Sequence, residues 1–235
     1  MKAKNQQARA TAITVRLFEP MYVDFDRQLS GLLIKRDAFI DRMISVEIPH
    51  ARSDLEGKEL SPVAKRYIAG RLKNLGKGDH PPLKQVCISV RPETADALDR
   101  LVKDHNLVRD AFLNRLIMLL RSSDALLEAL DLPKRINGFS HTGTQDMPTS
   151  PMKAIEEIQW DPLYYLRNAC MKKHDCGLYD LPLPEHLDAF SCFLPDEEVP
   201  RTLAHAQRLQ EEEEWAALLI DLENFESGLS GKTGR

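Results

Sequence analysis

The stretches KRDAFIDRMI (35–44) and VRDAFLNRLI (108–117) are two copies of one short sequence within a chain of 235 residues. Arg, Asp, Ala and Phe follow one another in both copies, and a second Arg and a closing Ile also match. In each copy the apolar residues recur three or four positions apart, which is the spacing of an amphipathic helix. The sequence therefore predicts the same helix twice, with the second copy starting 73 positions after the first.

A segment of alternating apolar and polar residues precedes each copy, AITVRL at 12–17 and VCISVR at 86–91. Alternation with β-branched residues predicts a strand with one buried and one exposed face. A second helical pattern lies between each strand and its repeated helix, and it ends at Ser30-Gly31 in the first repeat and at His105-Asn106 in the second. Each repeat is thus a strand followed by two helices.

A unit of about 35 residues with a single strand leaves both strand edges unpaired and encloses little apolar area. Two such units can bury their apolar faces if the strands pair antiparallel and the four helices interlock beneath them. On this interpretation the duplication is a folding requirement, and Phe39 and Phe112 should meet near the axis that relates the repeats.

With ITVRL and ISVR as strands and RDAF-[IL]-[DN]-R at the start of each second helix, the chain resembles the ribbon-helix-helix (Arc/MetJ-like) family, in two tandem copies. The turn before each second helix has no glycine, which is common at that place in the family. The resemblance implies a mostly α chain folded as a pseudo-dimer, with a two-stranded antiparallel ribbon that binds double-stranded DNA sequence-specifically. Its function would be that of a transcriptional regulator, such as a repressor.

A two-stranded ribbon fits the major groove, where its outward side chains meet base edges. The expected base-reading residues are Thr14 and Arg16 in the first strand and Ser89 and Arg91 in the second. Phosphate contacts are expected at the starts of the second helices and from the basic N-terminal residues: Lys35, Arg36, Arg109, Lys2, Lys4 and Arg9. The alternative interpretation is that these polar side chains simply face water.

Charge is unevenly distributed along the chain. Residues 1–125 carry 22 of the 32 Lys and Arg residues and 16 of the 36 Asp and Glu residues, so the remainder is strongly acidic. This asymmetry favours a polyanionic partner for the first part. We expect a DNA-binding domain at 1–130, with repeats at about 10–48 and 84–122, and a basic helical connector at 49–83 whose helix either adds phosphate contacts or only bridges the repeats.

The second part of the chain shows no recognisable family pattern. Pro, Gly, Ser and Thr predict a linker at 131–151, and helix signals predict a separate acidic helical domain of unknown role at 152–226. Residues 227–235, which contain SGKTG, are expected to be a disordered tail because the phosphate-loop pattern is incomplete. This acidic domain is a candidate for self-association or for binding a protein partner.

Other kinds of chemistry have weaker signals. A group of thiols and imidazoles lacks the usual spacing of zinc ligands, so metal binding stays an open alternative for Cys170, His174, Cys176, His186 and Cys192. We expect no enzyme activity, no cofactor and no membrane segment. A cytoplasmic location is expected because the basic N-terminus is not followed by an apolar stretch. Two alternative functions remain open, an accessory DNA-binding protein of plasmid or mobile-element processing and an antitoxin-like interaction scaffold.

Overall fold

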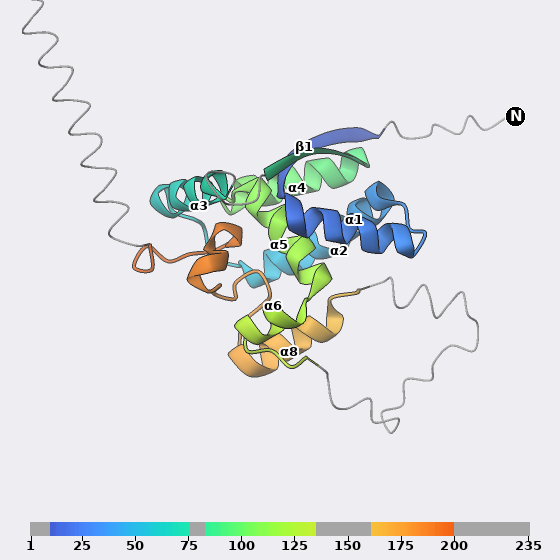
Figure 1. Ribbon diagram of the computed structural model, residues 1–235. Coiled ribbons are helices and arrows are strands. Elements are labelled where there is room, and N and C mark those ends of the chain that lie inside the picture. The colour runs from blue at the N-terminus through green and yellow to red at the C-terminus, as the bar shows by residue number, and fades with distance from the viewer. Residues whose placement is uncertain (1–9, 76–82, 135–160, 200–235) are drawn as a thin grey trace, which may run out of the picture. The chain divides into compact units, whose positions relative to one another are not determined.

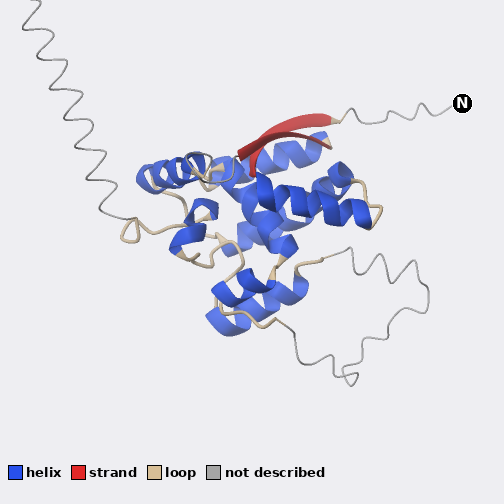
Figure 2. Cartoon of the chain, in the orientation of Figure 1, coloured by secondary structure: helices blue, strands red, loops and turns tan. Residues whose placement is uncertain are grey.

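The computed structural model describes residues 10–75, 83–134 and 161–199, and it is mostly helical with one two-stranded antiparallel sheet (Figures 1 and 2). Outside the described residues lie Lys2, Lys4 and Arg9, most of the expected linker, and residues 152–160 and 200–226 of the expected acidic domain. The elements, in chain order, are β1 (Thr11–Phe18), α1 (Glu19–Gly31), α2 (Arg36–Asp54), α3 (Pro62–Asn74), β2 (Leu83–Val90), α4 (Pro92–Asp104), α5 (Arg109–Arg121), α6 (Asp124–Ala129), α8 (Tyr164–His174) and the 3-10 helix η1 (Glu185–Phe190). The order strand, helix, helix therefore occurs twice, as the sequence predicts.

The register of the sheet relates the two repeats by an internal two-fold symmetry. Ile13 pairs with Ile88, and these two residues occupy the same place in the two copies of the strand motif. The two pairs on one side of this central pair have equivalents on the other side, where the ribbon continues for three further pairs, from Arg16 with Gln85 to Phe18 with Leu83. Apolar side chains at alternate positions are buried against the helices, namely Ile13, Val15, Leu17, Val86, Ile88 and Val90.

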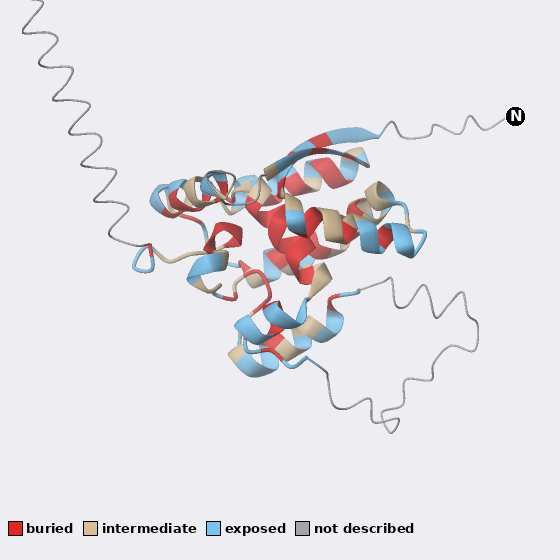
Figure 3. Cartoon of the chain, viewed as in Figure 1, coloured by how far each residue is buried: buried red, intermediate tan, exposed pale blue. Residues whose placement is uncertain are grey.

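The helices of each repeat pack on the strand of the other. α2, from the first repeat, contacts β2 and α4, whereas α5, from the second, contacts β1 and α1. Both second helices are thus crossed over beneath the ribbon, and α5 is almost entirely buried near the centre of the fold (Figure 3). Neither repeat can close its core without the other, because each strand is covered by a helix that belongs to the opposite repeat.

The turn between the two helices has the same backbone conformation in both repeats, without glycine. Leu33 in the first repeat and Asn106 in the second have positive φ values of 58° and 53°. Matching hydrogen bonds close the turns, from Ile34 N–H to the Leu29 carbonyl at 2.9 Å and from Leu107 N–H to the Val102 carbonyl at 2.8 Å. Asparagine tolerates this left-handed conformation, whereas leucine is strained in it.

Replacing Leu33 with Asn, the residue that the second repeat uses, should raise the free energy of unfolding by about 1 kcal/mol, because it relieves this strain. Leu33 is 93% exposed, so the change removes no core contact. The matched control is Leu32→Asn, a neighbouring exposed leucine with an ordinary φ of −90°. Urea denaturation measures both variants, and equal effects of the two would contradict the proposed strain.

The two phenylalanines of the repeated motif do not meet, so our expectation for Phe39 and Phe112 was wrong. Phe39 is only half-buried and packs on Phe25 of its own repeat, with ring centroids 6.1 Å apart. Phe112 is 1% exposed and stacks on Tyr179, with centroids 5.3 Å apart. The two equivalent helices differ because α5 is covered on its far side by residues after 160, whereas α2 buries the face of Ile40 and Ile44 and leaves Phe39 at its edge.

We expected residues 152–226 to form a separate domain, but residues up to Asp196 belong to the same compact unit as the ribbon. The Arg115 guanidinium on α5 is completely buried and donates hydrogen bonds to the carbonyls of Leu178, at 2.9 and 2.6 Å, and Leu181, at 2.7 Å. α6 and α8 lie at the end of this unit opposite the ribbon (Figure 1). The segment that follows α8 therefore completes the core under α5 instead of folding apart from it.

Substitution Tyr179→Ala tests this shared core. It should lower the free energy of unfolding by about 3–5 kcal/mol, the usual cost of removing a large buried aromatic side chain. Because Tyr179 stacks on Phe112, the loss should appear as a lower midpoint of one cooperative transition. Tyr164→Ala, which removes a tyrosine that is 53% exposed, should change the midpoint little. A Tyr179→Ala protein in which the ribbon melts as in the wild type would contradict a single core.

Candidate nucleic-acid interface

The outward face of the ribbon consists of exposed side chains that alternate with the buried ones. Opposite residues form cross-strand pairs, and this face holds Ala12 with Ser89, Thr14 with Cys87, and Arg16 with Gln85. Arg91 is also exposed and lies one residue beyond the end of β2. The structure thus places all four expected base-reading residues on or next to this surface. Gln85 was missed because we began the second strand at Val86: the next inward position is Lys84, which breaks the apolar alternation, although β2 itself begins at Leu83.

Each of the two ribbon arginines is paired with a carboxylate from the opposite repeat. Arg16 Nε donates to Asp110 Oδ2 at 3.0 Å, and its side chain remains 56% exposed. Arg91 donates twice to Asp41, from its backbone N–H at 3.0 Å and from Nε at 2.7 Å. These aspartates lie near the starts of α5 and α2, so the second helices orient the arginines as well as covering the strands. The strands themselves carry no acid, but the helix starts bring acids to their edges.

Asp37, in the first turn of α2, contacts the outward residue Ser89. Its carboxylate accepts a hydrogen bond from the Ser89 backbone N–H at 3.0 Å and another from Arg36 Nε, which binds its other oxygen at 2.7 Å. Burial alone would raise the pKa of Asp37, but these donors and the Arg36 charge hold it below its usual value. Asp37 is therefore kept ionised beside the ribbon. The backbone N–H of Ser89 has a carboxylate partner, which the equivalent residue Thr14 lacks in the described structure.

Asn114 takes the place in the second repeat that Asp41 takes in the first. Its fully buried amide accepts from the Phe18 backbone N–H at 2.8 Å and donates to the carbonyls of Arg16, at 2.9 Å, and Asp110, at 2.7 Å. The amide thus ties β1 to α5 without adding charge. The only hint in the sequence is the Asp/Asn difference within the repeated motif, and that difference alone does not say which strand the residue contacts.

The starts of the second helices have free backbone N–H groups, because neither N-cap residue, Lys35 nor Val108, makes a side-chain capping bond. Lys35 is exposed beside the first of these starts. The neighbouring arginines already have partners: Arg36 binds Asp37 and the Tyr22 hydroxyl, and Arg109 Nη1 lies 3.6 Å from Asp99. All three predicted phosphate-binding residues in the described chain therefore lie at helix starts, with Lys35 the least engaged.

The connector contains the basic helix α3, whose N-cap is Ser61; the Ser61 hydroxyl accepts from the Ala64 N–H at 3.0 Å. Its basic residues divide between two surroundings. Arg71 pairs with Asp188 of η1 at 2.8 Å and Lys65 donates to Asn106 at 2.7 Å, whereas Arg66 and Lys73 are exposed. The helix is therefore held against η1 and the second repeat. Arg71 and Lys65 thus support the bridging role, whereas Arg66 and Lys73 do not take part in these contacts.

The thiols and imidazoles do not form a metal site in the described part of the chain, where no group of three or more His, Cys, Asp or Glu residues is suitably arranged. The buried Cys170 thiol donates to the Cys176 carbonyl at 3.3 Å, and burial with the nearby Cys176 raises its pKa to about 12. His174 is bound to the Leu130 carbonyl at 2.9 Å. These residues act as core and hydrogen-bonding groups.

None of the helices in the described residues is long and apolar enough to cross a bilayer.

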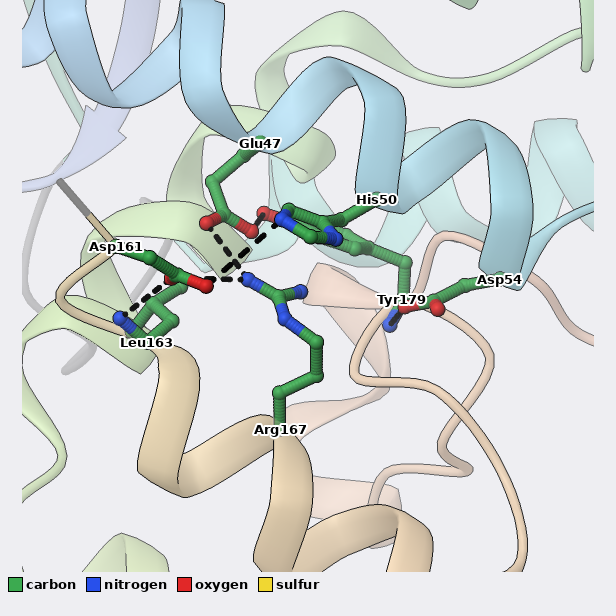
Figure 4. Close-up of polar contacts among 7 residues, drawn as sticks. All are labelled: Glu47, His50, Asp54, Asp161, Leu163, Arg167 and Tyr179. Atoms are coloured by element: carbon green, nitrogen blue, oxygen red, sulfur yellow. Dashed lines mark hydrogen bonds and ion pairs between the residues drawn. The ribbon is translucent and has the colours of Figure 1, made fainter. Parts of the chain in front are cut away.

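A second polar cluster, around Glu47 of α2, is a candidate by its chemistry because buried groups with shifted pKa values often gather at functional sites. Glu47 is completely buried, and burial raises its pKa although Arg167 opposes the shift. Its two oxygens accept from Arg167 Nη2 at 2.9 Å and from the Tyr179 hydroxyl at 3.0 Å (Figure 4). Asp161 also contacts Arg167, at 3.3 Å. Both carboxylate oxygens are occupied, so the cluster joins α8 to α2, although Arg167 Nε and Nη1 are buried without a hydrogen-bond partner in the described structure.

Comparisons of the chain with protein-family models, with curated proteins and with solved structures found no match.

The substitution Glu47→Ala should lower the free energy of unfolding by about 3 kcal/mol, because it leaves the Arg167 guanidinium and the Tyr179 hydroxyl without their buried acceptor. Glu56→Ala, at an exposed position just beyond α2, is the matched control and should have almost no effect. Chemical denaturation of the full chain measures both. A loss below 1 kcal/mol for Glu47→Ala would show that the cluster does not hold the segment after 160 in place.

Proposed function

We propose that this protein is a tandem ribbon-helix-helix protein that binds double-stranded DNA sequence-specifically, and that it regulates transcription. The observation that carries this proposal is the ribbon: two strands with a symmetric register that present polar and cationic side chains on a face uncovered by any described element. A ribbon of this kind has the width of the major groove, where each base pair offers its own pattern of donors and acceptors.

The composition of the outward face favours DNA over a protein partner. Protein interfaces usually have a core of aromatic and other apolar side chains. Here the exposed positions carry hydroxyl, amide and guanidinium groups, and Ala12 and Cys87 are the small exceptions. An interaction scaffold would have to use another surface. Hydrogen-bonding groups at alternate positions along a strand suit the regular spacing of base edges.

The ion pairs of Arg16 and Arg91 are compatible with DNA readout. Exposed salt bridges contribute about 0–1 kcal/mol, so Arg16 can exchange Asp110 for a guanine at little cost. Before binding, the Asp110 carboxylate holds the Arg16 guanidinium by an ion pair at 3.0 Å. The free N–H groups at the starts of α2 and α5 would meet the phosphates on either side of the groove, with Lys35 adding charge.

The substitution Arg16→Ala should weaken binding to the preferred DNA sequence by about 1–3 kcal/mol and relax the base preference at one place in the site. The preferred sequence is first selected from a random pool of DNA duplexes with the full chain, and affinities are then measured by fluorescence anisotropy. Binding should also weaken steeply as salt increases, because phosphate contacts release counterions.

Arg27→Ala is the matched control for this experiment, since Arg27 is also a surface arginine paired with an aspartate, Asp24, at 3.0 Å. It lies on α1 and not on the ribbon, so base preference should stay unchanged. If Arg16→Ala and Arg91→Ala both bind the selected sequence as the wild type does, the ribbon is not the reading element. A wild-type chain that selects no sequence would contradict the proposed function itself.

A further inference from the structure

The register of the ribbon is two-fold symmetric about the pair of Ile13 and Ile88, but the two ends of the ribbon differ. Arg16 has Gln85 directly opposite it on β2. The equivalent arginine, Arg91, lies beyond the last paired residue, and the position equivalent to Gln85 is Ala10, which precedes β1. One end therefore presents an arginine and an amide side by side, while at the other the arginine lies beyond the paired strands and the position equivalent to Gln85 carries no amide.

The two arginines also differ in how tightly they are held. Asp41 binds both the backbone N–H and Nε of Arg91, and Glu93 Oε1 lies 4.0 Å from its Nη1. Arg16 has a single carboxylate partner, Asp110, since the residue equivalent to Asp41 is the neutral Asn114, whose amide is turned to the backbone of β1. Arg91 must therefore break more contacts with carboxylates than Arg16 before it can reach a base.

Gln85 is exposed, and in the described structure its amide has no hydrogen-bond partner. In the major groove a glutamine amide can bind N6 and N7 of adenine at once, just as an arginine binds O6 and N7 of guanine. Residues opposite one another in an antiparallel pair have Cβ atoms roughly 5 Å apart. Two such side chains can therefore reach neighbouring base pairs, which are about 3.4 Å apart along a strand.

We propose, on the basis of the DNA-binding function above, that the ribbon reads its target with a polarity. Arg16 and Gln85 recognise a guanine and an adenine at neighbouring base pairs at one end of the site. Arg91, held by Asp41, positions the opposite end of the ribbon and contributes little base preference. The target is then asymmetric even though the backbone that reads it has two-fold symmetry.

Selection of bound sequences from a random pool of DNA duplexes tests this with the full chain as wild type, Gln85→Ala and Gln28→Ala. The wild type should select a non-palindromic sequence with adjacent guanine and adenine at one end. Gln85→Ala should lose about tenfold in preference for the adenine while keeping the guanine. Gln28, an exposed glutamine on α1, should be dispensable. A palindromic sequence, or an unchanged adenine preference in Gln85→Ala, would overturn the inference and leave the proposed function standing, whereas no selection at all would overturn both.

The variant Asp41→Asn tests the second part of the inference, because it gives the first repeat the residue that the second one has at Asn114. An asparagine can still accept from the Arg91 backbone N–H, but it no longer holds the guanidinium by charge. The selected sequence should then gain a guanine preference at the end opposite to the Arg16 end and become more nearly palindromic. A selected sequence identical to that of the wild type, from a variant with an unchanged melting temperature, would show that Asp41 does not restrain Arg91.

Discussion

The pairing of β1 with β2 is the constraint on which the rest of the structure depends. A two-stranded ribbon has one apolar face, and here that face can be covered only by helices crossed over from the opposite repeat. α2 lies on β2 and α5 lies on β1, and polar side chains at the starts of these helices, Asp41 and Asn114, bind the strand backbone directly. The positions of Arg16, Ser89 and Arg91 are therefore set by contacts with a helix that follows the other strand in the sequence.

The buried charge of Arg115 extends this dependence to the part of the chain after residue 160. A guanidinium without water costs several kcal/mol unless its donors find acceptors. In the described structure Nε and Nη2 donate to the carbonyls of Leu178 and Leu181, Nη1 has no partner, and no carboxylate lies within salt-bridge distance. The residue before Leu178, Gly177, has no side chain, and a Cβ at this position would lie only 2.0 Å from Asp54 Cγ. The segment after α8 is thus a structural part of the ribbon's own unit.

The elements that repeat in the sequence could be predicted from it, whereas the differences between the repeats could not. Alternation located both strands because a half-buried strand shows its two faces in a single sequence. The second arginine of the shared motif differs in burial between the two copies: Arg42 is exposed and Arg115 is completely buried. Its burial depends on a distant segment with no periodic pattern. The same holds at the interface, where four outward residues were predicted, but Gln85 and the two aspartates that hold the arginines, Asp41 and Asp110, were not.

Joining both strands in one chain has a consequence for the order of folding. The paired residues are far apart in sequence, from 65 positions for Phe18 and Leu83 to 79 for Thr11 and Val90. Bringing such distant segments together carries a loop-closure cost that slows folding, although this cost grows only slowly with length. During synthesis the edge of β1 has no partner until β2 has emerged from the ribosome, and its apolar face is not covered by α5 until later still. The first repeat must therefore wait with an unpaired strand edge, and the speed at which α3 and its flanking residues are translated sets how long that edge stays open to other chains.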